Sequence, residues 1–102
     1  MWLKESIEII ITELIWDDWN TEHIARHTVV PDEVELSLTD EYAVFLKAKL
    51  GRVMVLGRAG ERLISIVMNE QDTKGQFYVI TARDMSKKER AFYRTQKGKY
   101  DE

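Results

Sequence analysis

Residues 77–93 read FYVITARDMSKKERAFY and join an apolar run to a strong helix-start signal. The run at 77–82 is rich in β-branched and aromatic residues, which favour a strand. Ser86 and Glu89 have the spacing of a capping box, in which two side chains satisfy two backbone amides reciprocally. We therefore predict a strand that leads into a C-terminal helix, and Gly98 is placed to end that helix.

Upstream of this stretch the apolar pattern predicts more strands. Alternate residues from Tyr42 to Leu50 are apolar, as in a strand with one buried face. Two further apolar runs, at 53–56 and 63–68, are separated by stretches that contain glycine or polar residues, which predict turns. These stretches are 51–52, 57–60 and 69–76. Short connections of this kind predict an antiparallel β-meander.

The N-terminal part predicts one short strand and two short helices. Residues 7–12 are dense in β-branched side chains, which favour a strand. A cluster of capping residues at 17–20 precedes a helix that we expect over 21–27. Pro31 stands where the first position of a second helix would be. The predicted fold class is α+β, with a single domain over residues 1–102.

Charge is divided unevenly along the chain. The 102 residues include 15 Lys and Arg and 18 Asp and Glu, which gives a formal net charge of −3. Residues 1–46 carry a net charge of −9, whereas 47–62 carry +4 and 83–102 carry +3. We expect the acidic front and the basic back to face different partners.

The absence of cysteine excludes disulfides, thiolate metal ligands and thiol catalysis, and it makes a reducing compartment, the cytoplasm, the expected location. The longest apolar stretch is interrupted by Thr12 and Glu13, so it falls short of the roughly 20 residues that a membrane span needs. The acidic N-terminus is also unlike a secretory signal.

Several short motifs stand in an order that resembles a known family. They are Trp16-Asp17, Asn20, Arg26-His27, Gly57, Arg62, Thr81-Ala82-Arg83, Glu89-Arg90 and Tyr93. In this order, and at roughly this spacing, they resemble the BrnT family of type II toxin–antitoxin toxins, within the RelE/ParE-like superfamily. The sequence departs from the family pattern where Glu61-Arg62 replaces the usual Gly-Arg pair.

The resemblance implies a RelE/ParE-like fold and a metal-independent ribonuclease that inhibits translation. It also implies two partners, an RNA substrate and a cognate antitoxin that neutralises the toxin, and it leaves a homodimer within the complex open. No cofactor and no membrane partner are expected. A non-catalytic protein-binding module of the same fold is the alternative, and a structural subunit unrelated to toxins is a third class. The pI near 5.4 favours the binding module, whereas the basic segments favour the ribonuclease.

Cleavage of RNA without a metal requires stabilisation of the phosphorane charge and proton transfer at two oxygens. Arg62, Arg83 and Arg90 are candidates for the first task, because a guanidinium stays charged and binds phosphate bidentately. Arg83 is the strongest candidate, since it ends a strand and precedes a capped helix. The alternative for each is a surface arginine that pairs with Asp84 or Glu89.

Proton transfer has two candidates in the family motifs, His27 and Tyr93. The alternatives are an imidazole packed at a helix end and a tyrosine in the core. Of the neighbours Phe92 and Tyr93, we expect the phenol on the solvent side. His23 lies four residues before His27, a spacing that can hold a metal, but a third ligand is not evident and no metal site is predicted.

The C-terminal helix is dense in cations. Lys87, Lys88 and Arg94 are predicted to contact nucleic acid, because a polyanion is attracted by a run of unpaired positive charge. The alternative is an ordinary solvated helix face.

Overall fold

The structure is a computed structural model that describes residues 9–100. Its elements in chain order are β1 (Glu13–Ile15), α1 (Asp18–Ala25), α2 (Pro31–Leu38), β2 (Val44–Lys47), the 3₁₀ turn η1 (Lys49–Gly51), β3 (Arg52–Ala59), β4 (Arg62–Glu70), β5 (Gln76–Asp84) and α3 (Lys87–Tyr100). The predicted α+β class is confirmed, and α2 begins at Pro31 as predicted. Within the described range no helix is both long and apolar enough to cross a membrane.

The strands form one five-stranded sheet in the order β1-β5-β4-β3-β2. β2, β3, β4 and β5 are antiparallel neighbours, so the predicted meander is confirmed. β1 pairs in parallel with β5, and the long connection that such a pair needs is supplied by α1, α2 and three strands. β1 and β2 are therefore the two edge strands.

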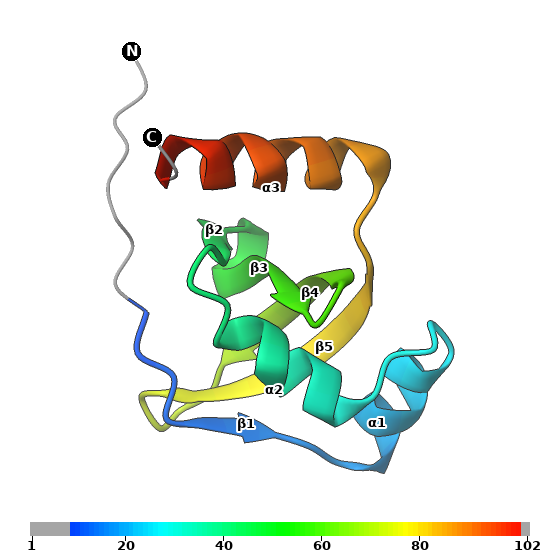
Figure 1. Ribbon diagram of the computed structural model, residues 1–102. Coiled ribbons are helices and arrows are strands. Elements are labelled where there is room, and N and C mark those ends of the chain that lie inside the picture. The colour runs from blue at the N-terminus through cyan, green and yellow to red at the C-terminus, as the bar shows by residue number, and fades with distance from the viewer. Residues whose placement is uncertain (1–8, 101–102) are drawn as a thin grey trace.

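Helices pack on both faces of the sheet (Figure 1). The alternation of side chains in β3 places Val55 on one face and Leu56 on the other. Val55 belongs to a buried cluster with Ile24 of α1 and Val34 of α2, whereas Leu56 packs with Tyr93 of α3. α1 and α2 therefore cover one face, and α3 covers part of the opposite face.

The N-terminal strand begins later than predicted. Residues 9–12 lie outside any strand, which makes the prediction of a strand at 7–12 wrong there, and residues 7 and 8 lie outside the described residues. The amides of Thr12 and Glu13 donate to the carbonyl oxygen of Gly75, at 2.8 and 3.2 Å. Parallel pairing thus starts where β5 starts. Thr12 meets the turn that precedes β5 and not a strand, and β-branched side chains alone do not supply a partner strand.

α1 begins earlier than predicted because Asp17 caps it. The Asp17 carboxylate accepts a hydrogen bond from the amide of Asn20, and Asn20 Oδ1 accepts one from the amide of Asp17. The fully buried Asn20 side chain also donates to the carbonyl oxygens of Ile15 and Val79, at 2.9 and 3.0 Å. One asparagine therefore fixes both the start of α1 and its attachment to the sheet.

β2 is shorter than the strand predicted over 42–50, because the chain turns at Leu50. Leu50 (φ 64°, ψ 32°) and Gly51 (φ 72°) both have positive φ, as a type I′ hairpin turn requires. Asparagine is the usual residue before such a glycine, and the left-handed conformation costs a residue such as leucine about 1–2 kcal/mol. Ala48 and Leu50 are exposed instead of lying on the apolar face, and Leu50 is 83% exposed.

β3 runs through Gly57, which the sequence placed in a turn. The turn between β3 and β4 contains only Gly60 and Glu61. A Cβ atom at Gly57 would lie 2.3 Å from the carbonyl oxygen of Ser37, at the C-terminal end of α2. Gly57 is therefore a strand residue whose missing side chain lets α2 approach the sheet.

Tyr93 holds α3 against the sheet. It forms the second buried cluster with Leu56 and Met85, and its hydroxyl donates to Asp40 Oδ2 at 2.6 Å. Burial, and next the hydrogen bond to Asp40, raise the pKa of the Tyr93 hydroxyl far above its usual range. The predicted orientation is wrong, since Tyr93 is only 2% exposed and Phe92 is 40% exposed. The reason is that Asp40, distant in sequence, gives the buried phenol a partner.

Gly57→Ala is expected to lower the free energy of unfolding by about 1–3 kcal/mol, because the backbone of Ser37 must move away. The matched control is Gly98→Ala. Gly98 lies inside α3, not at its end as predicted, and a Cβ atom there meets nothing within 4 Å. The control is expected to raise the free energy of unfolding by up to about 1 kcal/mol. Urea denaturation measures both variants, and equal stabilities would contradict the tight contact between α2 and β3.

Tyr93→Phe is expected to lower the free energy of unfolding by about 1–3 kcal/mol at pH 7, through loss of the hydrogen bond to Asp40. Because the pKa of Tyr93 is raised by folding, this stabilisation is complete below the unfolded pKa of about 10 and declines as the pH rises toward the folded pKa. Urea unfolding at pH 7 and at about pH 11 tests this. The difference in the free energy of unfolding between the parent and Tyr93→Phe should be smaller at the higher pH. A difference that does not change with pH would show that folding does not raise the pKa of the Tyr93 hydroxyl.

Candidate functional site

β5 ends in two charged residues that face opposite sides of the sheet. Arg83 is in register with Ser65 of β4, and Asp84 is in register with Ile64. Successive side chains of a strand point to opposite faces, so Arg83 faces the α3 side and Asp84 faces the side of α1 and α2. The two residues therefore organise separate groups of charged side chains.

Arg62 joins the sheet to the loop between α1 and α2. Its Nε donates to Asp84 Oδ1 at 2.7 Å, and its Nη1 donates to Glu33 Oε1 at 3.1 Å. Nη1 also donates to the carbonyl oxygen of Thr28 at 2.6 Å, and Nη2 donates to that of His27 at 3.1 Å. Every nitrogen of this guanidinium thus has a partner within the chain.

Asp84 is the carboxylate at the centre of the charged group that contains Arg62 and Arg90. The hydrogen bond from Arg62 lowers the pKa of the Asp84 carboxyl, and the same bond raises the pKa of Arg62. The charge of Arg90 on α3 also lowers the pKa of Asp84. Two predicted arginines therefore lie within electrostatic reach of one carboxylate, and it stays ionised well below neutral pH.

Arg83 makes a bidentate pair with Glu89 on α3. Nη1 and Nη2 of Arg83 donate to Glu89 Oε1 and Oε2, at 2.8 and 3.0 Å. Glu89 Oε1 also accepts from the amide of Ser86, whose Oγ accepts from the amide of Glu89, so the predicted capping box is present. Burial alone would raise the pKa of Glu89, but the hydrogen bonds from Arg83 and Ser86 outweigh it and lower that pKa. The Arg83 side chain remains 40% exposed, so a ligand can reach it.

The exposed side of α3 carries unpaired cations. These residues are Lys87, Lys88, Arg90 and Arg94. Their side chains make no ion pair and no hydrogen bond with residues 9–100. The residues predicted to contact nucleic acid are therefore free to bind phosphate.

Aromatic rings line the surface of α1 and the residues after it. The rings of Trp19 and His23 stack with centroids 5.0 Å apart, and the ring of His27 meets that of His23 edge-on at 5.8 Å. In the described part of the chain no three His, Asp or Glu side chains are placed to hold a metal ion. His27 is exposed, and its backbone carbonyl oxygen accepts from Arg62, so the residue adjoins the group around Asp84.

The predicted catalytic residues do not form a single cluster. The group around Asp84 contains Arg62, Arg90 and His27. Arg83 lies on the other side of β5 with Glu89, and Tyr93 is buried in the second apolar cluster. Any site that uses all of them must extend from His27, in the loop after α1, to Tyr93 in the middle of α3.

Two acidic partners, Glu33 and Asp40, were missed from the sequence. Glu33 lies 29 positions from Arg62, and Asp40 lies 53 positions from Tyr93. No local spacing links such residues, whereas Asp84 adjoins Arg83 and was recognisable as an alternative partner for an arginine.

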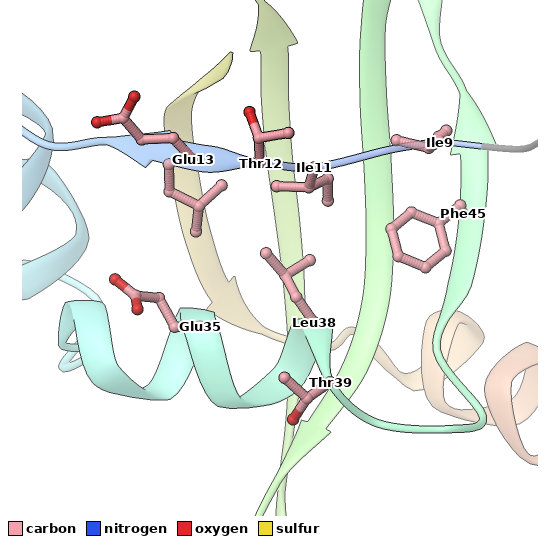
Figure 2. Close-up of a pocket in the computed structure, with 9 residues that line it drawn as sticks. Ile9, Ile11, Thr12, Glu13, Glu35, Leu38, Thr39 and Phe45 are labelled. Carbon is pink, nitrogen blue, oxygen red and sulfur yellow. The ribbon is translucent and has the colours of Figure 1, made fainter. Parts of the chain in front are cut away.

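An open groove of about 540 Å³ lies between residues 9–14 and α2. Figure 2 shows Ile11 and Leu38 facing each other across it, with Glu13 and Glu35 toward one end. None of the predicted site residues lines this groove. Its carboxylates repel a phosphate, so the cationic residues of β5 and α3 form the candidate site.

No protein-family model matches this sequence, and no curated protein matches it either. Among solved structures, the chain is similar to BrnT, a ribonuclease toxin of Brucella abortus. The two chains are 23% identical, with a TM-score of 0.59, and the match covers 74% of this chain and 97% of the toxin. The BrnT-like fold predicted from the motifs is confirmed, while the RelE/ParE-like assignment stays a prediction.

Proposed function

We propose that this chain is a toxin that cleaves RNA without a metal ion and thereby inhibits translation. The observation that carries the proposal is the likeness to a ribonuclease toxin, of which 97% is matched by this fold. The unpaired cations of α3 support it, because an RNA substrate requires a surface that attracts phosphate.

Cleavage by the 2′-hydroxyl of RNA needs a base for that hydroxyl, an acid for the leaving 5′-oxygen, and cations at the phosphate. In the proposed site Arg90 supplies a guanidinium with no internal ion pair within the described chain, and Arg83 supplies a second, partly exposed guanidinium. His27 is the proposed proton-transfer group: its imidazole would accept the proton of the 2′-hydroxyl, and the resulting imidazolium would return a proton to the leaving 5′-oxygen. The flanking RNA backbone is bound by Lys87, Lys88 and Arg94.

Arg62 and Tyr93 enter the proposal as positioning residues. Arg62 has all its donors engaged and fixes the carbonyl group of His27, so it acts by holding that residue in place. Tyr93 fixes α3 through its hydrogen bond to Asp40 and thereby places Arg90. This differs from the direct catalytic roles that the family motifs predicted for both.

A non-catalytic protein-binding module of the same fold is the second candidate. It is favoured because two of the predicted catalytic side chains are already hydrogen-bonded within the chain, Arg83 to Glu89 and Tyr93 to Asp40. An enzyme that bound phosphate through both guanidinium edges of Arg83 would have to release Glu89 first.

The proposed protein partner is an antitoxin with an acidic segment. The exposed cations of α3 are complementary to such a segment, and RNA would use the same surface. Binding of antitoxin and binding of RNA are therefore mutually exclusive in this proposal. The proposed location is the cytoplasm, in keeping with a chain that has no cysteine.

The purified chain is expected to cleave single-stranded RNA equally well with and without EDTA. Arg83→Ala and Arg90→Ala should each lower the cleavage rate by about 100-fold, because the phosphorane loses a charged donor. Lys74→Ala, in the turn between β4 and β5, is the matched control and should leave the rate unchanged. Gel analysis of end-labelled RNA measures these rates.

Two results of that assay would count against the proposal. Loss of cleavage in EDTA with rescue by zinc would overturn metal independence. A folded chain that binds a partner protein but cleaves no RNA would favour the binding module.

Arg62→Ala is expected to lower the free energy of unfolding by about 2 kcal/mol at neutral pH, because five acceptor groups lose their donor. Arg90→Ala should change it by less than about 0.5 kcal/mol, as an exposed residue. The pKa of Asp84 is lowered by folding, so the stabilisation is present above its unfolded pKa of about 4 and is lost as the pH falls toward its folded pKa. Urea unfolding at pH 7 and pH 3 measures this. Parent-like stability of Arg62→Ala would show that Arg62 is free to bind substrate.

A further inference from the structure

The tip of the β2–β3 hairpin is a second cationic surface, separate from α3. Residues 47–52 read KAKLGR and contain three cations and no acid. All six residues are exposed, and the side chains of Lys47, Lys49 and Arg52 make no ion pair or hydrogen bond with the described chain, 9–100. We name residues 47–52 the hairpin tip.

Leu50 at the centre of the hairpin tip is not explained by folding. It occupies a left-handed position, φ 64°, where a type I′ turn favours asparagine, and it is 83% exposed. It belongs to neither of the buried clusters. A residue that opposes the local turn preference and contributes nothing to the core points to a role in binding.

One cation of the hairpin tip, Arg52, lies on the α3 side of the sheet, whereas Lys47, in register with Val53, lies on the side of α1 and α2. Arg52 and Leu56 are four residues apart in β3, so their side chains share a face, and Leu56 packs against Tyr93 of α3. Arg52 is therefore roughly 13 Å along the strand from the α3 contact. One extended polyanion can touch both cationic surfaces.

We propose that the hairpin tip is a second contact for the RNA backbone, in which Lys47, Lys49 and Arg52 bind phosphates and Leu50 packs against a ribose or base. This rests on the proposed function, because it takes RNA as the ligand. RNA fits better than an anionic membrane, since even a single 14-carbon acyl chain gives only marginal membrane binding and one leucine gives less. The three cations act by releasing counterions from the nucleic acid.

The test measures binding separately from cleavage. The probe is a fluorescent single-stranded oligonucleotide with 2′-O-methyl groups, which lacks the hydroxyl that attacks the phosphate and so cannot be cut by this route. Lys49→Gln should weaken its binding by about fourfold near 150 mM salt and lower the slope of log affinity against log salt by about 0.7. The matched control Lys74→Gln removes an exposed turn lysine elsewhere and should change neither quantity.

Leu50→Asn keeps the turn and removes only the apolar side chain. It should weaken binding by about fivefold while raising the midpoint of urea unfolding, because asparagine accepts the left-handed conformation more readily. Parent-like RNA binding by both Leu50→Asn and Lys49→Gln would overturn the proposal. It would also be overturned if the parent chain did not bind the RNA probe. The same holds if the two variants bound RNA like the parent but had lost binding to vesicles of phosphatidylserine and phosphatidylcholine.

Cleavage of unmodified RNA is measured in parallel, so that the two proposals fail separately. A chain that binds RNA through the hairpin tip but does not cleave it supports this inference and contradicts the ribonuclease. A chain that cleaves RNA while the tip variants bind like the parent contradicts this inference and leaves the ribonuclease standing.

Discussion

The guanidinium of Arg62 is the interaction on which the arrangement of the helices depends. It sits at the start of β4 and binds the carbonyl oxygens of His27 and Thr28, just beyond the end of α1. Carbonyl groups at a helix end have no partner within the helix, and Thr28, which accepts from Arg62 here, has a positive φ of 58°. By accepting from Arg62, these groups fix the short loop that directs α2 onto the sheet. The same contacts withdraw Arg62 from any ligand, so one residue cannot serve both fold and substrate.

α3 is held differently, by polar contacts and a small apolar cluster. The pair of Arg83 with Glu89 fixes its first turn, and the bond from Tyr93 to Asp40 fixes its middle. A helix anchored at few points leaves most of its circumference to solvent. Its cations can therefore face outward without the burial cost that a packed lysine or arginine would incur.

Features that depend on neighbouring residues in the chain could be predicted from the sequence, and features that depend on distant residues could not. The start of α2 at Pro31 and the capping box of Ser86 and Glu89 depend on neighbours in the chain, and both were predicted correctly. The meander follows from alternation along short segments. The contacts of Arg62 and the orientation of Tyr93 depend on residues that only the folded chain brings near. For the same reason Gly57 looked like a turn residue, since its tight contact with Ser37 comes from another element.

The distribution of acids resolves the conflict between an acidic chain and an anionic ligand. Several carboxylates are engaged within the fold. Asp17 caps α1, and Glu33, Asp40, Asp84 and Glu89 bind an arginine or a tyrosine. Lys87, Lys88, Arg90 and Arg94 of α3 and the cations of the hairpin tip form no ion pair among residues 9–100. Since charges are screened within about 8 Å at physiological salt, a ligand responds to the surface that it approaches and not to the net charge of −3. An acidic pI is therefore compatible with a local cationic face, because much of the acid stabilises the structure.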